Sequence, residues 1–411
     1  MALARTLITN VSIFDGTGSD RFRGEVLVDG ERIVAVRPGE GNGRMEDALL
    51  IDGGGATLMP GLVEGHAHIT YPNAFDRPYP HLFPPAAIET TLMTVHNAHV
   101  LLDYGFTSAY SAGAIKPGIE TKLRDEIAAG RITGPRLRSA SMEIYFPGDP
   151  DARPMPHTPE ALRESVRESA DEGVDIIKLF LSGLNGVLTT SDFELTLTEE
   201  AVAAAADEAI RHGLTLSAHV RPAEGIKRAL RHGFRMLYHV EDVDDEVLDL
   251  MESRKDEIFC GPTIGGIAMR VEKGRDGPDR TRSQERLARY RETVDRIRGR
   301  GVRVLPFGDY GFPGRPHGHN ARDLTYFVKY LGFRPAEVLS AATKSGGELM
   351  GRDKIGMVAP GYLADLLLVD GDPLDDVAIL EDPAKLTMIM QGGNLHKMPP
   401  ARETTAARIL R

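Results

Sequence analysis

The chain has 411 residues, of which 41% are hydrophobic and 27% are charged, as in folded globular proteins. Its formal net charge of −11 argues against a nucleic-acid partner, because phosphate backbones favour a basic surface. The single cysteine, Cys260, excludes an intrachain disulfide, and no apolar run approaches the roughly 18 residues of a membrane helix. We therefore expect a cytoplasmic protein with neither a nucleic-acid nor a membrane partner.

Short strands separated by polar turns are predicted at both ends of the chain, over residues 6–53 and 355–398. The termini of a domain often lie close together. We therefore expect one small β-sandwich domain, formed by residues 1–55 together with residues 355–400. The remaining residues, 401–411, are expected to be a frayed tail.

The middle of the chain, residues 56–354, alternates strand-like apolar runs with helical runs such as 84–105, 198–213 and 223–233. The expected strands are residues 57–69, 106–112, 135–141, 174–181, 215–220, 234–240, 258–264 and 302–309. Eight strand–helix units in succession are typical of an α/β fold, the (β/α)8 or TIM barrel.

Barrel enzymes place their chemistry at the carboxyl ends of the strands. Five of the eight predicted strands end in a possible metal ligand, and four of these side chains belong to a set of only 13 histidines. Two of the histidines are one residue apart, which in an extended chain directs both imidazoles to the same side. The sequence therefore predicts a metal site formed by His66, His68, Lys178, His219, His239 and Asp309.

Residues 211–240 contain a near-repeat with a period of twenty residues, which we interpret as two successive strand–helix units. His219 and His239 close the two strands and are expected to bind metal. His212 and His232 precede the glycines that end the helices, at the opposite end of the barrel. We expect this second pair to be structural.

Lys178 is unusual among the predicted ligands because its ammonium group only donates hydrogen bonds. Beside a metal it must be deprotonated, paired with a carboxylate or covalently converted into an acceptor, and the residues alone leave these options open. Tyr238 precedes a ligand, so we expect it to point to the other side of its strand and pack in the core.

The order of these ligands resembles that of the amidohydrolase superfamily, and within it the prolidase-like and imidazolonepropionase-related group. The resemblance covers nearly the whole chain. It is carried by the segments LITNVSIFDGTG, LMPGLVEGHAHI, VDIIKLFLSG, AHVRPAEGIKRAL, HVEDVDDE, HGHNARDL, AATKSGGELMG and GMVAPGYLADLLLVDGDPL.

This resemblance implies that Lys178 is carboxylated and that its carbamate bridges two divalent metal ions, zinc or alternatively manganese or cobalt. One ion would be held by His66, His68 and Asp309, and the other by His219 and His239. A bridging hydroxide would attack the substrate, with Asp309 as general base and acid. The implied reaction is hydrolysis of a C–N bond in a small amide, peptide-like molecule or carbamate, and we expect a homo-oligomer.

The chain departs from the family pattern around the substrate. Its loop after the third strand, MEIYFPGDPDARPMPH, lacks the usual Gly-Gly-His-Gly-Asp sequence and offers Tyr145, Asp149 or His157 instead. The eighth strand ends in Phe-Gly-Asp, where relatives usually have Thr before the Asp. These differences leave the substrate of this chain open.

Further candidate substrate contacts follow strands five, seven and eight. Arg221 and Arg270 could each hold a substrate carboxylate through two hydrogen bonds. His317 and His319 form a second His-x-His pair in a Gly- and Pro-rich loop, so they are expected to touch substrate rather than bind metal.

Two alternatives to this hydrolase remain. The same superfamily includes cyclic-amide hydrolases and deaminases, but deaminases tend to use one metal without a bridging lysine, so Lys178 argues against them. A non-catalytic scaffold is a less favoured alternative, because such proteins usually lose ligands and all six are present here.

Overall fold

The computed structural model describes residues 5–39, 43, 45, 47–71, 87–143, 155–184, 189, 191–274, 277–312, 314–351 and 354–399. Two of the predicted substrate contacts, Tyr145 and Asp149, lie outside the described residues, as does the tail 401–411.

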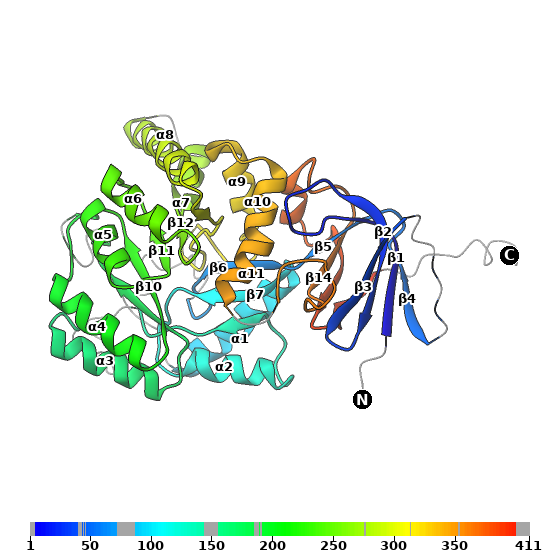
Figure 1. Ribbon diagram of the computed structural model, residues 1–411, viewed down its shortest axis with the longest axis horizontal. Coiled ribbons are helices and arrows are strands. Elements are labelled where there is room, and N and C mark those ends of the chain that lie inside the picture. The colour runs from blue at the N-terminus through cyan, green and yellow to red at the C-terminus, as the bar shows by residue number, and fades with distance from the viewer. Residues whose placement is uncertain are drawn as a thin grey trace, which may run out of the picture.

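Both ends of the chain contribute to one eight-stranded sheet, in which the order is β16-β15-β14-β5-β1-β2-β3 and β4 pairs with β1. The blue strands of the N-terminal part and the orange β14 lie together in Figure 1. The pairing order gives a single sheet, so the predicted sandwich of two packed layers stays a prediction. The strands are β1 (Arg5–Ile13), β2 (Phe22–Asp29), β3 (Arg32–Pro38), β4 (Ala48–Asp52), β5 (Thr57–Pro60), β14 (Leu366–Val369), β15 (Leu386–Gln391) and β16 (Asn394–Lys397).

Eight parallel strands form the middle of the chain, one in each of the segments predicted from the sequence. Three of them form one sheet, in the order β6 (Leu62–Ala67), β7 (Phe106–Ser111) and β8 (Arg136–Arg138). The other five form a second sheet, in the order β13 (Arg303–Val304), β12 (Phe259–Gly261), β11 (Met236–His239), β10 (Thr215–Val220) and β9 (Ile176–Phe180).

An isolated parallel bridge between Ala140 and Ile176 connects the two parallel sheets. Among the described residues no strand ladder joins β13 to β6, so the pairing does not by itself show a closed barrel. The first predicted strand, 57–69, divides at Gly61 into β5 and β6. A Cβ atom at Gly61 would lie 2.1 Å from the Thr107 hydroxyl, so glycine is needed where the chain passes from one sheet to the other.

Helices surround these strands in Figure 1. Several begin at side-chain caps: Thr158, Thr198 and Asp244 each accept a hydrogen bond from a backbone N–H in the first turn. The helices are α1 (Ala87–Asp103), α2 (Ile119–Ala128), α3 (Pro159–Asp171), α4 (Glu199–Arg211), α5 (Ala223–Arg231), α6 (Asp245–Ser253), α7 (Gly265–Lys273), α8 (Pro278–Gly299), α9 (Arg322–Leu331), α10 (Pro335–Ser340) and α11 (Gly346–Met350). A π-helical turn at Ala341–Ser345 separates the last two, and a 3₁₀ helix covers Val377–Glu381.

One buried cluster gathers side chains from both parallel sheets. At its centre a Cβ atom on Gly65 of β6 would lie 1.9 Å from the Phe307 ring, which follows β13. Glycine at position 65 therefore lets β6, the first parallel strand, approach the segment after β13, the last one. The cluster includes Val63, Tyr110, Ile176, Met236, Tyr238, Phe259, Leu305 and Phe307.

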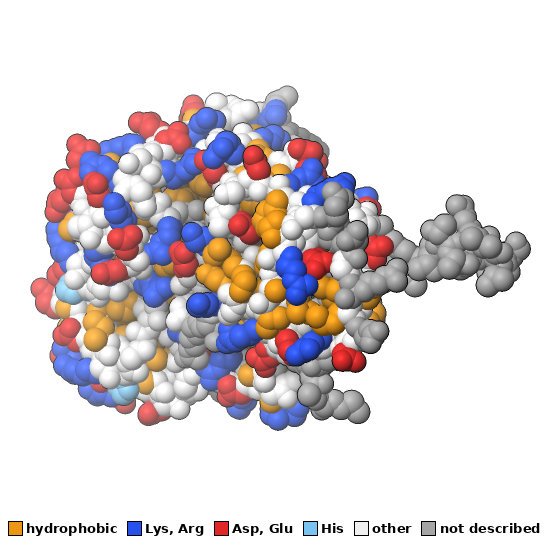
Figure 2. All heavy atoms as spheres, turned by 45° about the vertical axis from the view of Figure 1, so that its right-hand side comes forward, with side chains coloured by type: hydrophobic (Ala, Val, Ile, Leu, Met, Phe, Trp, Pro, Cys, Tyr) orange, Lys and Arg blue, Asp and Glu red, His pale blue; other side chains and the backbone are white. Residues whose placement is uncertain are grey.

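No described helix combines the length and the apolar character needed to cross a bilayer. Figure 2 shows one face of the molecule, on which basic and acidic side chains are interspersed between smaller hydrophobic patches. The described basic side chains on this face do not merge into one continuous surface.

Candidate metal centre

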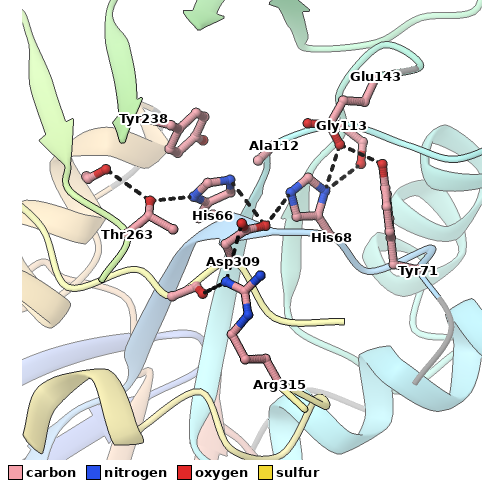
Figure 3. A network of polar contacts seen from close by, with 12 residues as sticks. His66, His68, Tyr71, Ala112, Gly113, Glu143, Tyr238, Thr263, Asp309 and Arg315 are labelled. Carbon is pink, nitrogen blue, oxygen red and sulfur yellow. Dashed lines mark hydrogen bonds and ion pairs between the residues drawn. The ribbon is translucent and has the colours of Figure 1, made fainter. Parts of the chain in front are cut away.

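His66, His68 and Asp309 converge at the carboxyl ends of β6 and β13 (Figure 3). The Oδ1 atom of Asp309 lies 3.1 Å from Nε2 of His68 and 3.7 Å from Nε2 of His66. One donor atom from each of the three residues lies within 4.8 Å of the others. The three predicted ligands therefore lie together, and their binding of a metal ion stays a prediction.

The outer nitrogen of each of these two imidazoles is engaged away from Asp309. Nδ1 of His68 lies 3.2 Å from the carbonyl oxygen of Gly113, and Nδ1 of His66 lies 3.2 Å from the hydroxyl of Thr263. Because that hydroxyl donates to the carbonyl oxygen of Gly261, it can accept a hydrogen bond from Nδ1–H of His66. Protons on Nδ1 would leave both Nε2 lone pairs directed toward Asp309, which is the arrangement that metal ligands require.

His219 and His239 lie on the neighbouring strands β10 and β11, with ring centroids 4.1 Å apart. The His239 ring centroid is 5.4 Å from that of His66, which joins the two groups of predicted ligands. Nε2 of His219 lies 3.1 Å from the carbonyl oxygen of Gly183. A carbonyl only accepts hydrogen bonds, so the proton belongs on Nε2 and the Nδ1 lone pair is available to a cation.

Burial sets the charge states that a cation would meet. It lowers the pKa of His66, His219 and His239 well below the ordinary value, so these imidazoles are neutral. Burial alone would raise the pKa of Asp309, but His66 and Arg315 outweigh it and hold that pKa well below its usual range. Neutral imidazoles beside an ionised carboxylate are a donor set that fits divalent metal ions.

The backbone around the centre adopts a conformation that side-chain-bearing residues rarely take. Positive φ angles occur at His239 (77°), Val240 (27°), Thr263 (54°) and Asp309 (59°), all at or beyond the ends of the parallel strands. Such residues cost roughly 1–3 kcal/mol each and persist where the surrounding structure holds them. Two of the predicted ligands thus owe their direction to local backbone strain.

This strain also corrects the expectation for Tyr238. Its side chain is buried, as expected, but its ring stacks on His66 at 3.9 Å between centroids instead of pointing away from the centre. The simple alternation of strand side chains fails because His239 turns back at positive φ. The Tyr238 hydroxyl donates to the carbonyl oxygen of Gly65 at 2.8 Å, which ties β11 to β6.

Lys178 is fully buried and forms an ion pair. Its Nζ atom donates to Oε1 of Glu143 at 3.0 Å and to the carbonyl oxygen of Ala112 at 2.8 Å. As an unmodified side chain, Lys178 therefore takes the salt bridge, which is one of the three options open to a buried lysine here. Electrostatic coupling of Lys178 to His66, His219 and His239 places it in the same network as the other predicted ligands.

Glu143 is the most important residue that the sequence analysis did not identify. Besides Lys178 it contacts Nδ1 of His68 at 3.2 Å and accepts a hydrogen bond from the Tyr71 hydroxyl at 2.7 Å (Figure 3). Burial lowers the pKa of His68, but Glu143 and Asp309 more than compensate and raise it. A signal was present, because Glu143 lies two residues after the end of the third predicted strand.

A second buried carboxyl, Glu64, holds the backbone of His66 in β6. It accepts hydrogen bonds from the backbone N–H of His66 at 3.0 Å and from the side chain of Asn320 at 2.7 Å. Burial raises its pKa to about 7. Glu64, itself held by Asn320, therefore positions the backbone of His66, a role that was not predicted from the sequence.

The two predicted arginines differ in their surroundings. Arg221 is buried and paired with Glu241 at 3.3 Å, and that carboxylate also binds Arg286. Among the described residues no carboxylate pairs with the exposed Arg270. Partial desolvation lowers the pKa of Arg270, and the guanidinium groups of Arg315, Arg286 and Arg221 lower it further, so this region is electropositive.

The other predicted substrate contacts are dispersed. His157 is exposed, and its Nδ1 atom lies 3.2 Å from the carbonyl oxygen of Met155. His317 is buried near the backbone of His68 and Tyr71, where burial lowers its pKa to about 4. His319 is exposed at the start of α9. His317 and His319 therefore do not act as one pair.

His212 and His232 lie at the C-terminal caps of α4 and α5, as predicted from the near-repeat. Each contacts a carboxylate: Nε2 of His232 lies 2.6 Å from Glu199, and Nε2 of His212 lies 3.5 Å from Glu208. Neither is part of the buried network around Asp309.

Comparison with known proteins agrees with this geometry. Residues 57–396, which make up most of the chain, match the model of the amidohydrolase family. The chain belongs to the amidohydrolase family. It is similar to an ochratoxinase and to a prolidase, and the family resemblance stated from the sequence is confirmed.

The curated relatives include an ochratoxinase from Aspergillus niger, 27% identical over 253 residues, which are 58% of this chain and 50% of the relative. The chain therefore spans about half the length of the curated relatives it matches. A prolidase complexed with N-methylphosphonate-L-proline has a TM-score of 0.79 at 25% identity, covering 96% of this chain and 100% of that one. The structure of A. niger ochratoxinase has a TM-score of 0.81 at 22% identity, covering 97% and 96%, and shows the shared fold alone.

Proposed function

We propose that the chain is a dinuclear metal-dependent hydrolase that cleaves a C–N bond in a small amide, peptide-like molecule or carbamate. The observation that carries this proposal is the convergence of neutral imidazoles and an ionised carboxylate at the strand ends. Membership of the amidohydrolase family and the similarity to a prolidase support the choice of bond.

In this proposal one ion is held by His66, His68 and Asp309 and the other by His219 and His239, with carboxylated Lys178 between them. Zinc suits such imidazole-rich sites, and manganese or cobalt are alternatives. When bound, the two ions would lower the pKa of water and polarise the substrate carbonyl. Carboxylation forms a bond between the Lys178 nitrogen and the carbon of CO₂ with release of a proton, and turns a donor into an anionic acceptor.

Asp309 then has the role of general base and acid. It is ionised, and two buried imidazoles and Arg315 fix its position, with Arg315 3.4 Å from Oδ2. A carboxylate held in this way can take the proton of the attacking water and pass it to the leaving nitrogen. Thr263 and Gly113 keep the two imidazoles oriented while this happens.

We also propose that the eight parallel strands close into a barrel, supported by the contact of Phe307 with Gly65 and by the hydrogen bond from Tyr238 to Gly65. The division into a composite domain of residues 1–55 and 355–400 and a barrel of residues 56–354 belongs to the same proposal. A small-molecule substrate, a cytoplasmic location and a homo-oligomeric state complete it.

The metal proposal predicts about two equivalents of divalent ion per chain at the centre. Chelation should abolish hydrolysis, and re-addition of zinc, manganese or cobalt should restore it. Lys178→Ala should lose both ions' shared ligand and therefore most bound metal. Elemental analysis of the purified wild type and of Lys178→Ala measures the bound metal. Assay of a library of N-acyl amino acids, dipeptides and aryl amides measures hydrolysis before and after chelation. Full activity in metal-free protein would overturn the proposal.

The arginine environment predicts a preference for anionic substrates. Arg270→Ala should raise KM for an N-acyl amino acid roughly 10- to 100-fold, because a hydrogen bond to a charged group contributes about 1.5–3 kcal/mol. KM for the corresponding uncharged amide should not change. Arg282→Ala is the matched control, because that exposed arginine lies on α8 and pairs with Asp279. Equal effects on acidic and neutral substrates would reject the assignment.

A further inference from the structure

We propose that His99, Asp103 and His396 form a second metal site, on the surface between α1 and β16, that binds a borderline divalent ion such as Zn²⁺ or Cu²⁺. None of these residues belongs to the centre around Asp309. The proposal is therefore independent of the proposed hydrolase function.

The donor atoms already lie close to the spacing that such an ion needs. Nε2 of His396 lies 2.6 Å from Oδ1 of Asp103, and Nε2 of His99 lies 3.7 Å from Oδ2. One donor from each residue lies within 4.8 Å of the other two. Tetrahedral zinc with bonds of about 2.0–2.1 Å separates its ligands by roughly 3.3 Å. Small side-chain rotations would therefore bring all three donors onto one ion.

The fold explains why these side chains meet. His99 and Asp103 are four residues apart on α1, so they occupy the same face of the helix. His396 lies on β16, the edge strand of the eight-stranded sheet. Its ring meets that of His99 edge-on, at 5.3 Å between centroids and 77° between planes. An ion here would connect a barrel helix to the last strand of the terminal sheet.

The surroundings leave this cluster open to an ion. The side chain of His99 is 51% exposed and that of Asp103 is 46% exposed, whereas His396 is more enclosed at 15%. All three line one surface depression together with Tyr104, Thr133 and Lys397. The Lys397 ammonium, which would repel a cation, donates to the carbonyl oxygen of Pro383 at 2.7 Å.

The chemistry of the donors selects the class of ion. Two imidazoles and one carboxylate suit zinc, copper or nickel, whereas magnesium and calcium prefer oxygen ligands throughout. Three protein ligands leave a coordination position for water. Because only the folded chain brings α1 and β16 together, binding should stabilise the native state.

Two other pairs in the chain provide matched controls, because each reproduces half of the cluster. His212 and Glu208 are four residues apart, as His99 and Asp103 are, and their side chains lie 3.5 Å from each other. His232 and Glu199 form a close pair at 2.6 Å between elements, like His396 with Asp103. Neither pair has a second histidine in a described metal-ligand group.

The test adds Cu²⁺ or Zn²⁺ to the full chain already loaded with its active-site metal. Equilibrium dialysis should show one further Zn²⁺ per chain, and electron paramagnetic resonance of the added Cu²⁺ should show coupling to two imidazole nitrogens. Saturating Zn²⁺ should raise Tm by about 2–4 °C or more. His396→Ala and His99→Ala should each lose the additional ion, whereas His212→Ala and His232→Ala should keep it.

Absence of a further ion would overturn the proposal, as would an ion that both His99→Ala and His396→Ala retain. If His396→Ala does not fold, the exposed His99→Ala still decides the outcome, because it leaves the contact of His396 with Asp103 in place. The hydrolase proposal is judged separately, by turnover and by the metal bound at the barrel centre.

Discussion

Replacing His239 by Asn should reduce turnover about 10³-fold or more, whereas the same replacement at His232 should leave turnover unchanged. His239 lies at the end of β11 among the buried imidazoles, 4.1 Å from the His219 ring and 5.4 Å from that of His66. Without it one proposed ion loses half of its imidazole ligands. Metal activation contributes several kcal/mol to such hydrolyses, and each 1.36 kcal/mol is a tenfold change in rate.

His232 offers a control of the same residue type from the same near-repeat. It caps α5 and pairs with Glu199, with a side chain 23% exposed. Loss of a partly exposed pair costs about 0.2–1 kcal/mol. His232→Asn should therefore lower the free energy of unfolding slightly in urea titrations while turnover and bound metal remain at the wild-type level. If both variants lost activity equally, the assignment of His239 to the metal centre would be wrong.

Much of this architecture could be predicted because it depends on local patterns. The strands that carry His219 and Lys178 are short apolar runs, and parallel strands that are buried on both faces have this composition. Parallel strands present their carboxyl ends at the same edge, so the ends of these segments predicted where the ligands meet. The structure brings His66, His68 and Asp309 together at or beyond the ends of two of these strands, and their binding of a metal ion stays a prediction.

The remaining features depend on contacts between distant segments or on backbone strain, and sequence periodicity contains neither. Glu143 meets Lys178 only because the segment after β8 lies beside β9. Tyr238 pairs in register with His219 and contacts His66, whereas His239 turns toward the same centre at a positive φ angle, which no residue type at that position signals. Arg221 was predicted to be available to substrate, but it pairs with Glu241, a carboxylate that Arg286 of α8 also contacts.

The ion pair between Lys178 and Glu143 gives a test of lysine carboxylation that does not depend on turnover. In metal-free protein Glu143→Gln should lower the free energy of unfolding by about 3–5 kcal/mol, because it leaves a buried ammonium without its carboxylate. In metal-loaded protein the proposed carbamate is anionic, so the loss of the neighbouring negative charge at position 143 should cost little. The variant therefore loses more stability in the metal-free form than in the metal-loaded form. Because 1.4 kcal/mol corresponds to a tenfold change in affinity, Glu143→Gln should bind metal at least about 10²-fold more tightly than the wild type.

Urea unfolding of both forms and competition with a chelator measure these two quantities, and Tyr71→Phe is the control. Its hydroxyl donates to Glu143 at 2.7 Å without contributing to the ion pair, so its removal should destabilise the metal-free and metal-loaded forms by the same amount. An equal loss in both forms for Glu143→Gln would mean that Lys178 keeps its ammonium group beside the metal. Lys178 would then be a structural partner of Glu143, and the shared ligand of the two ions would have to be sought elsewhere.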